Sequence, residues 1–233
     1  MSMLSSAFVP NRDVYLGLAE GWARLWVRCS VFPSVGVMQQ PTSRQLYAYW
    51  DRVRNGRVAP RRFEIEPAKI AAILPETFIV EDAGMLGYRF RLAGTKICEH
   101  FGRELRGADL LGLWEAKDRD ALSTLLRNVF TDAAAGHGLF RAYTSNGRAA
   151  GFELVLLPLI HTGEAINRVL GAITAIEPPF WLGAEPLLRQ EIVELHLHWP
   201  DEVPAFMTQG GAGVISLARR RSRILSGRLG NAK

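Results

Sequence analysis

The chain has 233 residues, a net charge of +5 and two cysteines, and 48% of its residues are hydrophobic. This length and composition are typical of a folded domain with a substantial core, and they exclude a disordered chain. Having only Cys29 and Cys98 excludes a disulfide scaffold and a four-cysteine metal site, and it fits a reducing cytosol. No stretch is long and apolar enough to predict a membrane-spanning helix. We therefore expect a cytoplasmic protein.

The positive charge is concentrated at the end of the chain. The last fifteen residues contain six basic residues and no acidic one, which leaves 22 basic and 23 acidic residues elsewhere. A domain that coats nucleic acid with a basic surface is therefore not indicated. The basic tail, residues 218–233, favours contact with nucleic acid or an anionic membrane surface, or it serves as a solubilising end. Its cations include Arg219, Arg220, Arg221 and Arg223.

Residues 1–40 form an extension without a clear structural pattern. Residues 13–29 fit a weak amphipathic helix in which Trp22 and Trp26 lie one turn apart, and the alternative is a disordered segment. The extension lacks the basic start, apolar stretch and cleavage site of a secretory signal. Because Met38 stands just before a well-formed helix start, a further hypothesis is that translation begins there in vivo.

The first well-defined element is a helix from Thr42 to Arg54, within an N-terminal helical cap at residues 41–74. Thr42 and Gln45 have the spacing of a capping box, and Gly56 provides a left-handed stop. The apolar residues of this helix recur on one face. That face needs a cover, which is either the protein's own sheet or a second subunit. Its residues are Leu46, Tyr47, Trp50 and Val53.

Short elements follow up to residue 135. Thr77–Val80 is β-branched and aromatic, and Tyr88–Leu92 alternates apolar and charged residues, so both are expected to be strands. Helices are expected at Pro67–Leu74, Thr95–Phe101 and Lys117–Ala135, where apolar residues have helical spacing.

Three more strands complete the predicted sheet. Leu139–Thr144 connects to Phe152–Leu159 through Asn146-Gly147, a strong hairpin signal, and Arg168–Ile176 follows. Helices therefore lie in the sequence between a strand pair and a three-stranded meander. This order predicts an α+β fold with one domain core, residues 75–178, in which helices pack on one face of a five-stranded antiparallel sheet.

Several motifs resemble those of PAS sensory domains. Gly94–Gly107 resembles their short helical middle, and Phe152–Leu159 and Leu170–Ala172 look like their last two strands. More specifically, residues 43–176 are similar to a bacterial family of small regulatory proteins with a single PAS domain and no attached output enzyme. The motifs that carry this likeness are Trp50, Arg61–Pro67, Leu111–Trp114 and Phe152–Leu159. The resemblance implies a PAS-like fold preceded by an N-terminal helix.

The same resemblance implies a regulatory role rather than catalysis. PAS domains bind a small ligand or cofactor between sheet and helices, or they dimerise and dock partners. We expect a non-catalytic signalling protein that forms a homodimer through the Thr42–Arg54 helix and contacts signalling proteins through Arg57, Arg61 and Arg62. The other interpretation is that these arginines cap the C-terminus of the helix and form part of the solvated surface. The expected ligand pocket comprises Tyr88, Phe90, Ile97, His100, Phe101, Trp114, Leu125, Phe140, Leu154 and Ile173.

Cofactor binding has weaker support in the sequence. Flavin-binding PAS domains carry a reactive cysteine in an Asn-Cys-Arg-Phe-Leu-Gln block, whereas Cys98 lies in Ile-Cys-Glu-His-Phe, so a flavin photoreceptor is not expected. A haem- or metal-bound gas or redox sensor is the alternative hypothesis. His100 lies on a helix, as the axial ligand does in some haem-binding PAS sensors, although a surface or helix-capping histidine is the favoured interpretation.

Metal ligation has one candidate cluster, in the C-terminal extension at residues 179–217. Its members have no metal-site spacing, so we expect no metal site. The competing interpretation is a surface-docked amphipathic helix at Glu185–Leu197, and His137, between two glycines, is expected in a turn. The cluster comprises Glu191, Glu194, His196 and His198, and the apolar face of the expected helix comprises Leu187, Leu188, Ile192 and Leu195.

Overall fold

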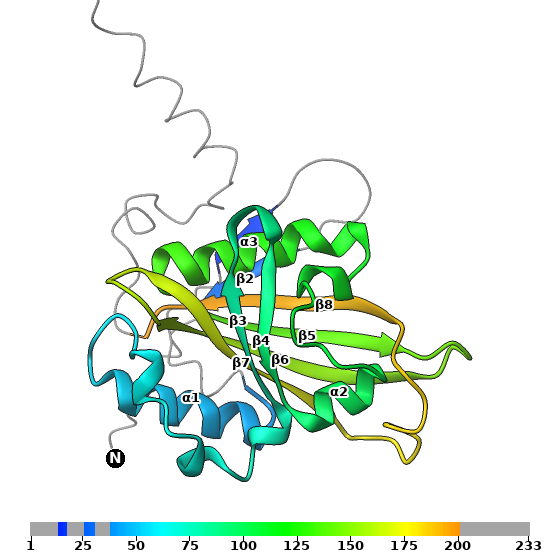
Figure 1. Cartoon of the computed structure of the whole chain (residues 1–233). Coiled ribbons are helices and arrows are strands. Elements are labelled where there is room, and N and C mark those ends of the chain that lie inside the picture. Colours follow the sequence, from blue (N-terminus) through cyan, green and yellow to red (C-terminus); the bar gives the residue numbers. More distant parts are fainter. Residues whose placement is uncertain (1–13, 18–25, 31–37, 201–233) are drawn as a thin grey trace, which may run out of the picture.

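The computed structural model describes the backbone of residues 14–17, 26–30 and 38–200, and the side chains of residues 38–200 (Figure 1). One eight-stranded sheet has the order β1-β2-β8-β5-β6-β7-β3-β4. All neighbours are antiparallel except β2 and β8, which are parallel. The strands are β1 (Val14–Gly17), β2 (Trp26–Ser30), β3 (Thr77–Asp82), β4 (Tyr88–Ala93), β5 (Ala135–Tyr143), β6 (Ala149–Ile160), β7 (Ile166–Ile176) and β8 (Arg189–His198), and the α-helices are α1 (Pro41–Arg54), α2 (Thr95–Phe101) and α3 (Ala116–Asp132).

The five strands expected from the sequence are β3, β4, β5, β6 and β7, and the α+β class is confirmed. Gly147 takes a left-handed φ of 77° in the turn between β5 and β6, as the Asn-Gly pair predicts. Where a helix was expected at Pro67–Leu74, the structure has two 3₁₀ turns, η3 (Pro67–Ile70) and η4 (Leu74–Glu76). Pro75 contributes to the break, because it has no backbone N–H and cannot donate the hydrogen bond that would continue an α-helix through this segment.

The C-terminal extension adds β8 to the edge of β5, so the helix predicted at Glu185–Leu197 is wrong. The register between β5 and β8 shifts by one residue and leaves Val193 as a bulge. The apolar residues of β8 that face the core are consequently Ile192, Leu195 and Leu197. Because the bulge interrupts the alternation of the strand, these apolar residues are unevenly spaced in the sequence, and their spacing resembles that of the apolar face of a helix.

Two segments of the N-terminal extension are strands as well. β1 and β2 form a hairpin, and Val27 of β2 lies opposite Leu195 of β8. The helix or disordered segment predicted for residues 13–29 is therefore wrong at residues 14–17 and 26–30. Trp22 and the basic tail, residues 218–233, lie outside the described residues. Translation from Met38 stays a hypothesis.

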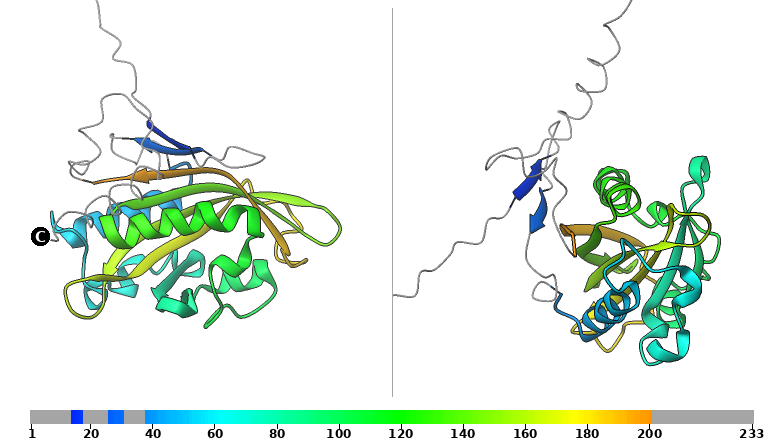
Figure 2. Two further views of the ribbon diagram at one scale, coloured as in Figure 1. Left: turned by 90° about the horizontal axis from the view of Figure 1, so that it is seen from above. Right: turned by 90° about the vertical axis from the view of Figure 1, so that its left-hand side faces the viewer.

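The helices of the predicted core, α2 and α3, pack on one face of the sheet as expected, and the preceding helix α1 covers the opposite face (Figure 2). α2, α3 and the 3₁₀ turn η6 (Leu111–Leu113) cover the inner face, and α1 covers the outer face. Leu154 and Leu156 of β6 belong to the inner core, and Val155 and Leu157 belong to the outer core. Burial on both faces explains the nearly continuous apolar run of this strand. Within the described residues, no helix is long and apolar enough to span a membrane.

The apolar face of α1 packs on its own sheet. Leu46, Tyr47 and Trp50 are buried there, and Val53 packs partly buried at the margin. The Trp50 indole N–H donates a hydrogen bond of 2.8 Å to the carbonyl of Pro158 on β6. The sequence left two possible covers for this helix face, the protein's own sheet or a second subunit. In the structure, the sheet covers it. These four residues are therefore not an exposed dimer surface.

The start of α1 also differs from the prediction. The capping box at Thr42–Gln45 is wrong, because the helix begins at Pro41 and its N-cap residue, Gln40, makes no side-chain cap. The Thr42 hydroxyl donates to Glu76 instead, at 2.5 Å. The cap comes from the sheet, since Glu153 of β6 accepts a hydrogen bond from the backbone amide of Gln40 at 2.9 Å.

Candidate functional site

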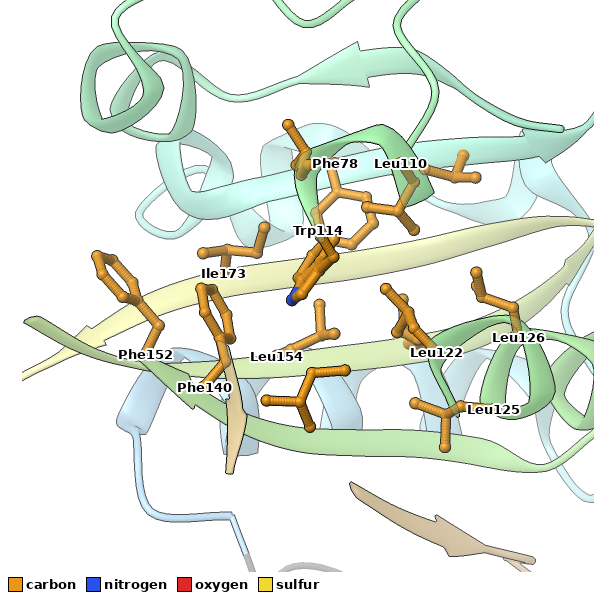
Figure 3. Close-up of a cluster of buried hydrophobic side chains, with 14 of the residues drawn as sticks. Phe78, Leu110, Trp114, Leu122, Leu125, Leu126, Phe140, Phe152, Leu154 and Ile173 are labelled. Atoms are coloured by element: carbon orange, nitrogen blue, oxygen red, sulfur yellow. The ribbon is translucent and has the colours of Figure 1, made fainter. Parts of the chain in front are cut away.

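The expected pocket residues lie together in the inner core, but they fill it. Eight of them belong to the buried inner cluster, Tyr88 packs against it half-buried, and His100 is buried at its edge. Figure 3 shows Trp114 reaching from the segment after η6 toward Leu154 and Phe140 of the sheet. The Trp114 and Phe140 rings meet edge to face, with centroids 5.7 Å apart. Core packing therefore accounts for most of these residues.

A narrow gap lies in this core, and it has no room for a water molecule. Three of the expected pocket residues, Trp114, Phe140 and Leu154, line it. The other predicted pocket residues lie away from it. The sequence missed Leu122, Gly138, Leu139, Ile192 and Leu195, which complete the lining.

Gly138 is the lining residue with a recognisable sequence signal. A glycine inside a strand marks a close approach of neighbouring groups, and a Cβ at Gly138 would lie 2.8 Å from Leu195 Cδ2. Ile192 and Leu195 were missed because β8 was expected to be a helix on the surface.

One of the residues that line the gap carries an unsatisfied hydrogen-bond donor. Trp114 is 2% exposed, and its indole nitrogen has no hydrogen-bond partner. Buried donors without partners are rare, because each forfeits its hydrogen bond to water. The remaining lining side chains are apolar. An acceptor atom on a small apolar molecule would satisfy this indole if the gap widened.

His100 does not fit a haem ligand in this fold. Burial lowers the pKa of His100, which keeps the imidazole neutral as a metal ligand requires. However, its ring packs edge to face on Phe152 with centroids 5.7 Å apart, and the gap beside Trp114 does not reach it. Haem-sized ligands need a cavity of roughly several hundred Å³.

Cys98 is similarly placed away from the gap. Its Sγ lies 3.6 Å from Glu104 Oε1, and burial raises the pKa of the thiol, which disfavours the reactive thiolate.

The candidate metal-ligating cluster, at which no metal site was expected, divides into two parts. Glu191 pairs with Lys117 of α3 at 3.0 Å, whereas Glu194, His196 and His198 lie on the outer face of β8. Among residues 38–200, no group of histidines, cysteines and carboxylates has metal-binding geometry. His137, expected in a turn, instead lies inside β5, where it is buried beside Glu153.

Comparison with known proteins identifies the family. A family model described as a PAS domain matches residues 38–174, which is more than half of the chain. The chain belongs to the PAS-domain family. A sensory or signalling role follows from this membership. No curated protein matches the sequence.

Solved PAS structures resemble this PAS domain at low sequence identity. The LOV protein of Rhodobacter sphaeroides is 15% identical with a TM-score of 0.38, over 47% of this chain and 65% of that one. A PAS domain from Colwellia psychrerythraea is 15% identical with a TM-score of 0.36, over 48% and 98% of the two chains. A PAS domain of an HTR-like protein from Haloarcula marismortui is 17% identical with a TM-score of 0.34, over 49% and 95%.

The arginines expected to contact partners are partly engaged within this PAS domain. Arg57 donates to Glu64 at 3.0 Å and to the carbonyl of Val53 at the end of α1. Arg61 pairs with Glu164 at 3.2 Å. Capping, one of the two interpretations of this cluster, therefore applies to Arg57.

Exposed apolar side chains are adjacent to these arginines in the sequence. Phe63 is 76% exposed and Val58 is 63% exposed, and Arg62, next to Phe63, is partly exposed. Sequence reasoning missed Phe63 and Val58, because single apolar residues in an irregular segment have no periodicity. We name Val58, Arg62 and Phe63 the Phe63 surface.

Proposed function

We propose that this PAS domain is a non-catalytic cytoplasmic signalling protein that senses a small, mainly apolar molecule bearing one hydrogen-bond acceptor. The observation that carries the proposal is the buried, unpartnered indole N–H of Trp114 at an otherwise apolar gap. A ligand entering between Trp114 and the sheet would bury its apolar surface and accept this hydrogen bond. Entry requires the gap to widen, so binding would move Trp114 relative to β5 and β6.

Trp114→Phe tests the proposal, because it keeps an aromatic ring and removes the N–H. Native mass spectrometry of the full chain, purified from its host, is expected to detect a bound small molecule in the wild type. The variant should bind it about five- to tenfold more weakly, which is the effect of one hydrogen bond of about 1 kcal/mol. Trp50→Phe is the matched control, since its N–H serves Pro158 on the outer face. A wild type without a bound molecule, or equal binding by Trp114→Phe, would contradict the proposal.

We also propose a second function, that of an adaptor that contacts signalling proteins, because the Phe63 surface combines exposed apolar and cationic side chains. Aromatic and arginine side chains are the residue types that contribute most to protein–protein affinity. The homodimer expected from the sequence needs a surface other than the buried face of α1, and the Phe63 surface is the one we assign to it.

Phe63→Asp is expected to reduce recovery of partner chains, or of a second copy, by about tenfold. Met85→Asp is the control, since Met85 is fully exposed on the turn between β3 and β4. Affinity purification from host cells measures partner recovery, and analytical ultracentrifugation measures self-association. Recovery and self-association that Phe63→Asp leaves unchanged would remove this surface from the proposal.

A further inference from the structure

One wall of the gap beside Trp114 is formed by β8, a strand outside the part of the chain that matches the family. Ile192 and Leu195 of β8 line the gap. The family model matches residues 38–174, so neither β8 nor β2 belongs to the matched region. A ligand in the gap would therefore contact an element that this chain adds to the matched domain.

The other edge of β8 carries the N-terminal hairpin. β5 pairs along the whole of β8, whereas β2 pairs with it only over Val27–Ser30. Val27 is the register partner of Leu195, so a single residue of β8 lines the gap and also lies opposite β2 in the sheet. The β2 pairing is parallel, which is slightly less stable per residue than antiparallel pairing. Of its two neighbours, β8 therefore loses β2 more easily than β5.

A ligand can enter the gap only if one of its walls moves, because the gap has no room even for water. β5 and β6 supply one wall, and long antiparallel ladders hold both strands on either side. The remaining walls are β8 and the helical side, which contributes Trp114 and Leu122 of α3. Movement is therefore expected at α3 or at β8.

α3 and β8 are attached to each other at both ends, so displacement of one is passed to the other. Near the start of α3, the Asp118 carboxylate accepts a hydrogen bond of 3.2 Å from the backbone amide of Ile192. At the end of α3, the carbonyl of Asp132 accepts a hydrogen bond of 3.1 Å from the Trp199 indole. The bulge at Val193 lies between these attachments, and a bulge is a place where a strand bends. Whichever wall moves, the displacement reaches the part of β8 that pairs with β2.

We propose that β8 couples the gap to the N-terminal hairpin: a ligand that enters the gap displaces β8 around Leu195 and releases β2 from its edge. The inference rests on the proposed ligand, because it states how occupation of that site changes the rest of the chain. Coupling of two equilibria is reciprocal. The docked hairpin therefore lowers the affinity for the ligand by the same factor by which the ligand weakens docking of the hairpin.

Gly138→Ala tests the coupling without any ligand. A methyl group at Gly138 would lie 2.8 Å from Leu195 Cδ2 and 3.2 Å from the carbonyl oxygen of Glu194, so it pushes on β8 as an occupant of the gap would. Hydrogen exchange of the full chain measures amide protection in each segment. Protection at residues 26–30 should fall about tenfold, while protection of β3 stays within about twofold of the wild type.

Two control variants identify the cause. Gly151→Ala on β6 adds a methyl group at an ordinary 3.7 Å from Ile176 Cβ, so protection at residues 26–30 should match the wild type. Leu195→Ala removes the atom that the new methyl group meets most closely. Adding Gly138→Ala to Leu195→Ala should therefore lower the protection by less than about threefold, compared with about tenfold in the wild-type background.

Several results would overturn the coupling. They are wild-type amides at residues 26–30 that exchange without protection, unchanged protection there in a folded Gly138→Ala, a loss of the same size in β3, and a tenfold loss that persists beside Leu195→Ala. If Gly138→Ala does not fold, Leu122→Phe decides, because it enlarges a lining side chain from α3 and should release residues 26–30 in the same way. Unchanged protection in Leu122→Phe then contradicts the coupling.

The outcomes for the ligand and for the coupling can be told apart. Native mass spectrometry that detects no bound molecule contradicts the proposed function, whatever Gly138→Ala does. A bound molecule in the wild type, together with a folded Gly138→Ala in which β2 stays protected, contradicts the coupling alone.

Discussion

Replacing Glu153 with alanine is expected to lower the free energy of unfolding by about 3–5 kcal/mol, the usual cost of removing one partner from a buried charged network. Glu153 is fully buried. Its removal leaves the backbone amides of Gln39 and Gln40 and the Nε2 of His137 without their acceptor. It also removes the β6 carboxylate that caps α1, together with its favourable interaction with the helix dipole.

Urea unfolding at pH 7 measures this effect. Glu164→Ala is the matched control, because Glu164 pairs with Arg61 but its side chain is 92% exposed. An exposed ion pair contributes at most about 1 kcal/mol, so the control should differ little from the wild type. Equal unfolding free energies for the two variants would show that the Glu153 network does not hold α1 on the sheet.

The stabilisation by Glu153 is also expected to depend on pH in a defined direction. The pKa of Glu153 in the folded protein is below its ordinary value of 4.5. A depressed carboxyl pKa gives stability that is fully present above the ordinary value and is lost as the pH falls through the folded-state pKa. Wild-type stability should therefore decline below about pH 4.5, and the decline should be shallower in Glu153→Gln, which cannot ionise.

The sequence predicts the core of this fold because its strands and helices carry local patterns. The Asn146-Gly147 turn and the apolar run of β6 are patterns of residues close together in the sequence, so they can be recognised without knowledge of the tertiary structure. The surface that covers α1 could not be predicted in this way. An apolar helix face indicates that another part of the structure packs on it, but it does not indicate which part. β8 was mistaken for a helix because the bulge at Val193 interrupts strand alternation.

The candidate site was predictable only in part. Three of the pocket candidates, Trp114, Phe140 and Leu154, line the gap, but their neighbour Ile192 comes from β8, for which a helix was expected. Glu153 was read as part of a strand motif, although a single carboxylate inside an apolar run signals a buried partner. That partner, His137, lies between two glycines, and this pattern is typical of a turn. Its pairing with Glu153 depends on the register of β5 and β6, which no local pattern supplies.

A second large effect is expected from Gly171→Ala on β7. Gly171 lies opposite Phe78 of β3 in the sheet, and the Phe78 ring lies across it. A Cβ at this position would be 2.1 Å from Phe78 Cζ, far inside van der Waals contact. The ring cannot move aside freely, because Phe78 is fully buried and packs edge to face on Phe90 at 5.5 Å. Overpacking of this kind costs about 1–3 kcal/mol and occasionally more.

Gly151→Ala provides the control for this prediction, since a Cβ at Gly151 of β6 would meet only Ile176 Cβ at an ordinary 3.7 Å. Its unfolding free energy should match that of the wild type within about 0.5 kcal/mol. Combining Gly171→Ala with Phe78→Leu tests the cause, because the smaller side chain makes room for the added methyl group. The double variant should then be more stable than the sum of the two single effects predicts, by about 1 kcal/mol or more in thermal or urea unfolding. If the two effects simply add, the strain at Gly171 comes from somewhere other than the Phe78 ring.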